Sequence, residues 1–270
     1  MTDNVLPRDG AGRETTMPAQ QWQTEGIAPM ERPGAVSRMF MRIVAFAERQ
    51  NLRWSQLGNP CVYDTASFRW AADIERDWQA VRDELVSVLA RKADLPNVQD
   101  ITADAATISR DAGWKIFPFT AYGVRSQLNI ERCPATWRIV QRVPGLRTAM
   151  FSILDAGKRI PPHRGPYNGV LRLHLGLVVP EPPEKLGIRV GSDRCQWREG
   201  KVLIFDDAFE HEAWNDTEHM RAVLFVDFER PMRFPARTLN RALLAIAPLS
   251  PFLREGRDNL RRWERRFYGR

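Results

Sequence analysis

The sequence predicts a mostly β protein with flanking α-helices, and two observations support this fold class. From Gly113 onward, short apolar or alternating runs are separated by turns rich in Pro, Gly and Asp, with no helical period between them. Before that point, and again after Pro231, apolar residues recur at intervals of three or four, which is typical of amphipathic helices. Successive strands without intervening helices favour an antiparallel sandwich or barrel over a parallel α/β sheet.

The first part of the chain divides into a polar lead-in and a helical segment. Residues 1–34 are rich in Pro, Gly, Thr and Gln and show neither apolar period, so we expect them to be disordered. A short amphipathic helix is predicted over 36–49. A second helix is indicated by apolar residues spaced three or four apart, namely Ile74, Trp78, Val81, Leu85 and Leu89. We therefore expect a helical buttress over 35–110.

The β-rich half begins at Gly113 and ends near residue 233. Five strands are predicted after its opening segment, at Thr148–Leu154, Leu171–Val179, Ile188–Val190, Lys201–Phe205 and Ala222–Phe228. They place a β core at 113–233 within one domain spanning 35–235. The remaining residues, 236–270, are expected to form a basic helical C-terminal extension, in which Pro248 and Pro251 end a first short helix.

Composition limits the classes of protein to consider. A chain of 270 residues is long enough to bury a full core as one large domain. Its three cysteines, Cys61, Cys133 and Cys195, are far apart and form no CxxC pair, so neither a disulfide framework nor a structural zinc site is expected. No apolar run approaches the roughly 20 residues that span a bilayer, and the first residues do not form a signal peptide. We therefore expect a cytoplasmic protein.

The net charge of +7 is concentrated at the C-terminal end. From Arg230 to Arg270 there are eleven arginines against three acidic residues, an excess of +8, so the rest of the chain is near neutral. Basic residues interleaved with Trp263, Phe267 and Tyr268 suit an anionic membrane surface, an acidic partner or nucleic acid. A solvated helical face is an equally good reading of this charge.

His163 and His211 are the first candidates for chemistry. They bracket a stretch that holds three of the four histidines among strand-like runs, and neutral imidazole is the commonest metal ligand. Strands from one small barrel could bring the two rings together to hold a divalent metal. The sequence contains no Gly-x-Ser-x-Gly elbow, no GxxxxGK[ST] loop, no GxGxxG and no HExxH, so these other schemes are not supported.

The third ligand of a common iron site is missing. Iron centres that activate oxygen usually add a carboxylate to two histidines, but Gly165 stands two residues after the first histidine. Asp206, Asp207 and Glu212 are near His211 in sequence, yet we interpret them as turn and cap residues.

Two further groups could bind an acid. Arg221 begins a predicted strand ten residues after His211, and its guanidinium could make a two-pronged contact with a small carboxylate. Arg172 and His174 alternate with leucines, so both point to one face of their strand, which would be the ligand side of a barrel or a merely wet face. Ser152 lies in another strand and carries no signal by itself.

With these residues assembled, the chain closely resembles the aspartyl/asparaginyl β-hydroxylase family. The resemblance extends over roughly residues 113–233 and is carried by four segments, 151–157, 162–168, 171–180 and 200–212. It implies an Fe(II)- and 2-oxoglutarate-dependent dioxygenase on a double-stranded β-helix, a jelly-roll or cupin-like core. Such an enzyme uses O2 to hydroxylate an unactivated C–H bond.

The resemblance also implies roles for individual residues. His163 and His211 match the family's iron-binding, catalytic histidines, and Gly165 matches the glycine that this family has where related enzymes have Asp, so that water would complete the metal site. Arg221, with Ser152 beside it, matches the group that holds the distal carboxylate of 2-oxoglutarate. His174 matches the residue that contacts the carboxylate nearest the metal, and Arg172 matches a substrate-side arginine.

The family resemblance by itself does not identify the substrate. The ending Arg-Pro-Met at 230–232 resembles the bacterial branch that 2-hydroxylates acyl chains of lipid A or ornithine lipid. We therefore expect a lipid-linked acyl chain as substrate and peripheral contact of the basic tail with the inner face of the cytoplasmic membrane, and we do not expect nucleic acid as a partner. Alternatives are a β-hydroxylase of aspartyl or asparaginyl residues or of a free amino acid, and a non-catalytic metal-binding protein that has kept the fold.

Overall fold

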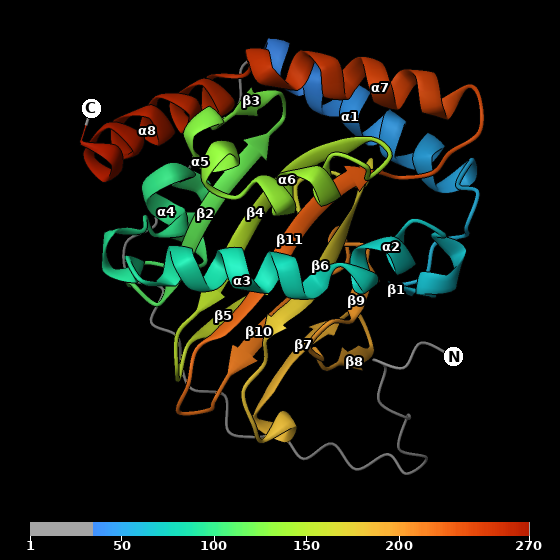
Figure 1. Cartoon of the computed structure of the whole chain (residues 1–270). Coiled ribbons are helices and arrows are strands. Elements are labelled where there is room, and N and C mark those ends of the chain that lie inside the picture. The colour runs from blue at the N-terminus through green and yellow to red at the C-terminus, as the bar shows by residue number, and fades with distance from the viewer. Residues whose placement is uncertain (1–34, 270) are drawn as a thin grey trace, which may run out of the picture.

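Two antiparallel sheets, of seven and four strands, form the centre of the protein and confirm the mostly β fold class (Figure 1). The computed structural model describes residues 35–269, so the predicted lead-in at 1–34 lies outside the described residues. The larger sheet has the order β1 (Val62–Tyr63), β9 (Val202–Phe205), β6 (Val170–Val178), β11 (Arg221–Glu229), β4 (Leu146–Leu154), β2 (Trp114–Ala121) and β3 (Val124–Arg125). The smaller sheet has the order β5 (Arg159–His163), β10 (His211–Asn215), β7 (Leu186–Val190) and β8 (Asp193–Cys195).

The two sheets pack face to face, as in a jelly-roll. Alternation along β6 sends Leu171, Leu173 and Leu175 to the outer face, where all three are fully buried. Arg172 and His174 point to the inner face, toward the smaller sheet, as the alternation predicted. A ring contact at 5.9 Å between Phe205 of β9 and His211 of β10 joins the sheets directly. The inner face of the larger sheet is therefore the place where polar side chains collect.

Helices cover the outer face and one end of the larger sheet (Figure 1). They are α1 (Ala35–Arg53), α2 (Ala71–Arg76), α3 (Trp78–Leu89), α4 (Val98–Ile101), α5 (Gln127–Arg132), α6 (Pro134–Val140), α7 (Ala236–Ile246) and α8 (Pro251–Tyr268). The helix predicted from Ile74 to Leu89 is broken at Asp77, whose backbone leaves the helical region between α2 and α3. Its spacing was nevertheless informative, because Ile74, Val81 and Leu85 are buried.

The C-terminal helix differs from the expectation that its aromatic residues are available to a membrane. Trp263 and Phe267 are 4% and 3% exposed, and both rings contact Phe117 of β2, at 6.1 and 6.2 Å. Tyr268 donates a hydrogen bond to Asn129 at 2.8 Å. The aromatic residues Trp263 and Phe267 thus belong to the inner, packed side of α8, and the exposed side carries charged residues of both signs, mostly arginines. The expectation that these two rings are available to a membrane was wrong.

Among the helices of residues 35–269, none is long and apolar enough to cross a membrane.

Candidate functional site

The two candidate metal ligands lie on adjacent strands of the smaller sheet. His163 ends β5 and His211 begins β10, where the two residues are paired in register and their rings are 4.1 Å apart between centroids. The Nδ1 atom of His163 is 2.8 Å from the carbonyl oxygen of Pro161, and Nδ1 of His211 is 2.9 Å from that of Phe209. A carbonyl only accepts, so each Nδ1 carries the proton. Each Nε2 therefore has a free lone pair, the tautomer in which histidine binds a metal.

Burial keeps both rings neutral. It lowers the pKa of His163, and it lowers the pKa of His211 to about 3, where the charge of Arg172 adds to the effect. A neutral imidazole can donate its lone pair to a metal at physiological pH, whereas a protonated ring cannot. The pair is thus poised for a cation without any need to lose protons.

His174 presents a hydrogen-bond donor with nothing to receive it. Its Nδ1 accepts from Nε1 of Trp197 at 3.2 Å, and an indole nitrogen can only donate, so the proton of a neutral His174 is on Nε2. Burial, followed by the charge of Arg221, lowers the pKa of His174 far below its usual range. Nε2 is buried and has no hydrogen-bond partner among the described residues. Such a group is costly unless a ligand satisfies it.

Arg221 is a fully buried guanidinium without a counterion. It opens β11, is 2% exposed, and has no Asp or Glu oxygen within 4.0 Å among residues 35–269. Its contacts are the Trp197 ring, 4.2 Å from Cζ, and a long hydrogen bond of 3.4 Å to the backbone oxygen of Ser152, while Nε has no partner. Burial lowers its pKa to about 9, so the group stays protonated at neutral pH. A buried, unpaired cation of this kind fits the carboxylate of a bound acid.

Ser152 lies on the same face of the larger sheet as Arg221. It pairs with Val223, two residues along β11 from Arg221, and its hydroxyl accepts from Nε1 of Trp114 at 3.1 Å. The structure therefore brings together all the residues that were predicted to hold a small acid. Trp197 contacts both His174 and Arg221, and Phe205 contacts both His174 and His211, so these side chains lie close together between the sheets.

Arg172 is in the same region but is already paired. Its Nε donates to Asp227 at 2.9 Å, its Nη2 lies 2.9 Å from Asp207, and its guanidinium covers the Phe225 ring at 4.3 Å. Burial alone would lower the pKa of Arg172, but Asp207 and Asp227 raise it well above its ordinary value. A substrate group at Arg172 would therefore meet a fixed cluster of one cation and two carboxylates.

Asp207 is the site residue that sequence reasoning missed. The interpretation of Asp206 and Asp207 as turn and cap residues was incomplete, because both are 1% exposed and paired with arginines, Asp206 with Arg230 and Asp207 with Arg172. The Asp207 carboxylate fills the space beside Gly165, where any Cβ would overlap it. Its Oδ1 has no hydrogen-bond partner in the described part of the chain. A carboxylate from another loop thus stands against Gly165, the position where related iron sites carry one.

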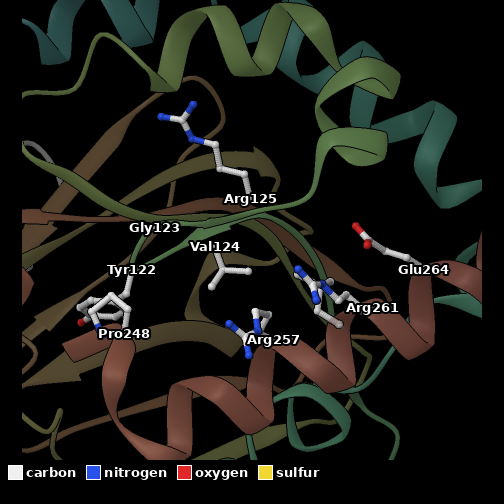
Figure 2. A pocket seen from close by; sticks show the side chains of 9 residues that line it. Tyr122, Gly123, Val124, Arg125, Pro248, Arg257, Arg261 and Glu264 are labelled. Carbon is white, nitrogen blue, oxygen red and sulfur yellow. The ribbon is translucent and has the colours of Figure 1, made fainter. Parts of the chain in front are cut away.

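Tyr122, which directly follows β2, was not singled out from the sequence. Burial, followed by the charges of Asp227 and Asp207, raises its pKa. It adopts a left-handed backbone with φ of 46°, which the adjacent turn residue Gly123 shares at 89°. Tyr122 also lines a hollow of about 410 Å³ between this turn and α8, and the basic residues that line it are Arg125, Arg257 and Arg261 (Figure 2).

The donor set limits which metal sites are possible. No group of three or more His, Cys, Asp or Glu gathers around one point among residues 35–269, so a closed structural site with four protein ligands is not formed there. A metal held by two neutral imidazoles would keep most of its positions open to water or other ligands. Open positions distinguish catalytic from structural metal sites.

Comparison with known proteins identifies the family of this chain. Residues 75–231 match the family described as Aspartyl/Asparaginyl beta-hydroxylase. The chain is 58% identical over 269 residues to the ornithine lipid ester-linked acyl 2-hydroxylase of Rhizobium tropici, covering 99% of this chain and 96% of that protein. It is 35% identical over 178 residues to human aspartyl/asparaginyl beta-hydroxylase, covering 64% of this chain and 22% of that protein.

Among solved structures, a Pseudomonas putida prolyl-4-hydroxylase aligns with a TM-score of 0.40 at 16% identity, covering 57% of this chain and 87% of that one. The family match spans more than half of the chain and contains all six predicted site residues. This chain belongs to the aspartyl/asparaginyl β-hydroxylase family of hydroxylases.

Proposed function

We propose that this protein is an Fe(II)- and 2-oxoglutarate-dependent dioxygenase that 2-hydroxylates the ester-linked acyl chain of ornithine lipid. The observation that carries the proposal is the guanidinium of Arg221, which is buried without a carboxylate partner among residues 35–269, together with two neighbouring histidines whose Nδ1 atoms carry the proton. A cation without a counterion is expensive to bury, and a dicarboxylic co-substrate would remove that cost.

His163 and His211 would hold the metal through Nε2. Imidazole suits Fe(II), and two such ligands leave room for a bidentate acid, O2 and water. Bound Fe(II) and 2-oxoglutarate supply the oxidising power for the reaction, in which one oxygen atom of O2 enters the substrate C–H bond and the other enters succinate, with release of CO2. Asp207 fills the space beside Gly165, and its Oδ1, which has no hydrogen-bond partner among the described residues, would accept a hydrogen bond from a nearby water.

Three residues would orient the 2-oxoglutarate. Arg221 would bind its distal carboxylate with two N–H donors, and Ser152 lies on the same face to support it. His174 would donate from Nε2 to the carboxylate near the metal, which satisfies the proton that has no partner among the described residues. Trp197 fixes both, because it bonds Nδ1 of His174 and stacks on Arg221.

The substrate assignment rests on the relative from Rhizobium tropici. An identity of 58% along nearly the whole of both chains supports the same reaction on the same lipid, whereas the human relative matches over a shorter, less similar region. We therefore place ornithine lipid before lipid A and before aspartyl or asparaginyl side chains.

The test is a reaction of the purified full chain with ornithine lipid, Fe(II), 2-oxoglutarate and O2, followed by mass spectrometry of the lipid and measurement of succinate. We expect a hydroxyl on the 2-position of the ester-linked chain, formed in equal amount with succinate. His211→Ala should abolish both products, while the matched control His219→Ala, on an exposed turn, should retain them. Hydroxylation of an Asp- or Asn-containing peptide but not of the lipid would refute the substrate. Absence of succinate with every substrate would refute the chemistry.

A further inference from the structure

Large apolar side chains are exposed along α1. Met39, Ile43 and Phe46 are 60%, 42% and 49% exposed, and their spacing of four and three residues puts them in one row on the helix surface. Ala47 and Asn51, four and eight residues after Ile43, are fully buried, so α1 packs on the protein along the flank next to this row. Phe40, Met41 and Leu52, elsewhere on the helix, are also exposed, by 49%, 61% and 40%. An exposed apolar row of this size on a single helix marks an interaction surface.

A second row, of basic residues, runs beside the first. Arg42, Arg49 and Arg53 are spaced seven and four apart, so they follow one edge of the apolar row. None of the three has an ion-pair partner among residues 35–269. A helix that exposes large apolar side chains beside arginines without ion-pair partners among the described residues has the composition of helices that lie in a membrane interface.

Helix α7 extends this surface. It lies beside α1 in Figure 1, packs on it through contacts between the two helices, and adds the exposed residues Phe234, Ile246 and Leu249 at its two ends. Together, residues 35–53 and 231–250 contain seven arginines and one acidic residue, Glu48. Pro248, next to Leu249, lines the hollow that also contains Arg257 and Arg261 (Figure 2). We call the exposed side chains of α1 and α7 the docking surface.

The docking surface is tied to the segment that follows His163. Asn51 of α1 donates to the hydroxyl of Tyr167 and to the side chain of Asn168, both at 3.0 Å. Asn240 of α7 donates to the backbone oxygen of Gly169 at 2.9 Å. Both helices therefore hold the residues 164–169 that connect the metal-binding strand β5 to β6.

The strand pairing of β11 shows where α1 and α7 meet the larger sheet, which is at the Arg172 end of the site. Along β11 the inner face runs from Arg221, through Phe225 opposite His174, to Asp227 opposite Arg172, and then to Glu229 opposite Val170. Gly169 adjoins Val170, so α1 and α7 meet the sheet at the end away from Arg221. A surface bound there would lie on the Arg172 side and leave the proposed 2-oxoglutarate end undisturbed.

We propose that α1 and α7 dock the protein on an anionic lipid bilayer and present the Arg172 end of the site to lipids in that bilayer. Presentation of lipids to the site rests on the proposed function, whereas binding to the bilayer rests only on the exposed apolar and basic residues. Charge decides the partner: pairing with a second copy would bring the same basic edges together, because a two-fold interface repeats one surface on both subunits. An anionic bilayer instead satisfies both the arginines and the apolar row.

The test is co-sedimentation of the full chain with vesicles of phosphatidylcholine alone or with about 30% phosphatidylglycerol, a fraction that gives the surface a negative potential. We expect binding to the anionic vesicles only. Ile43→Ser/Phe46→Ser and Arg42→Gln/Arg49→Gln should each weaken binding roughly tenfold or more, since each removes two contacts with the interface. Circular dichroism would show that these exposed substitutions leave the fold intact.

Two matched controls locate the surface. Val86→Ser removes an apolar residue of α3 that is 56% exposed. Arg265→Gln/Arg266→Gln removes two exposed arginines of α8. Neither variant should weaken vesicle binding tenfold. Loss of binding only with the α8 variant, or no binding by the wild type, would overturn the proposal. So would sedimentation velocity that shows a dimer dissociated by Ile43→Ser/Phe46→Ser without vesicle binding. Hydroxylation of detergent-dispersed ornithine lipid reports separately on the proposed function and should survive in every variant.

Discussion

Replacing Arg221 by methionine should stabilise the protein while removing its response to 2-oxoglutarate. Without a bound acid, the guanidinium is fully buried against Trp197 and has no carboxylate partner among the described residues. A fall in pKa from 12.5 to about 9 corresponds to about 5 kcal/mol as an upper limit to the cost of burying its charge. Replacing buried charges with apolar side chains of similar size typically stabilises by about 1 to 4 kcal/mol, and we expect a gain in this range.

The same variant should lose its affinity for the co-substrate. Removing one partner of a buried charge pair costs about 2 to 5 kcal/mol, so 2-oxoglutarate should bind Arg221→Met at least roughly thirtyfold more weakly. Urea unfolding measures the first effect, and calorimetry in the presence of Mn(II), which does not turn over, measures the second. 2-Oxoglutarate should raise the unfolding temperature of the wild type and leave that of the variant unchanged.

Arg230 provides a matched control of opposite sign. It is also buried, but it pairs with Asp206 and donates to Tyr63 at 2.8 Å. Arg230→Met would leave Asp206 as an uncompensated buried charge and should destabilise by about 3 to 5 kcal/mol. If Arg221→Met also destabilises to that degree and binds 2-oxoglutarate normally, the reasoning about an unpaired cation is refuted.

Three further predictions concern packing and pH. Gly165→Ala should lower the free energy of unfolding in urea by about 1 to 3 kcal/mol, because the added Cβ meets Asp207. In an Asp207→Gly background the same substitution should cost less. An equal cost with and without Asp207 would contradict the contact. The folded-state pKa of His211 is about 3, so the apoprotein should lose stability as pH falls from about 6.5 toward 3, where only the unfolded chain gains this proton. His211→Asn should flatten that profile, and an unchanged slope would exclude the residue as its source. Trp263→Ala should cost about 3 to 5 kcal/mol, whereas a loose tail would give no measurable change in unfolding.

The spacing of apolar residues predicted most of the strands and helices. It missed elements whose boundaries do not depend on that spacing. The alternation at 171–175 gave both faces of β6 correctly, because a strand at the middle of a sheet has little freedom in its register. Strand β5 was missed because its sequence includes Pro161 and Pro162, which are poor strand formers and are tolerated at this sheet edge. The break at Asp77 leaves no mark in apolar spacing, since Ile74 and Val81 are buried on both sides of it.

The candidate site was predictable as a set of residues but not as an arrangement. Histidine and arginine types in strand contexts, together with the family resemblance, identified the groups that the structure gathers between the sheets. The tautomers of His163 and His211 depend on carbonyls of Pro161 and Phe209, and the place of Asp207 depends on a loop packing against Gly165, so neither has a signal in sequence. The buried side of α8 did have one, in the spacing of Leu260, Trp263 and Phe267.

A crystal structure of the full chain grown without O2, with Mn(II) in place of iron and with 2-oxoglutarate, tests the central claim most directly. The account predicts that Nε2 of His163 and Nε2 of His211 both bind the metal. It also predicts that one carboxylate of 2-oxoglutarate meets Arg221 while the other receives a hydrogen bond from His174. A metal bound elsewhere, or an Arg221 that remains unpaired with the acid present, would contradict it.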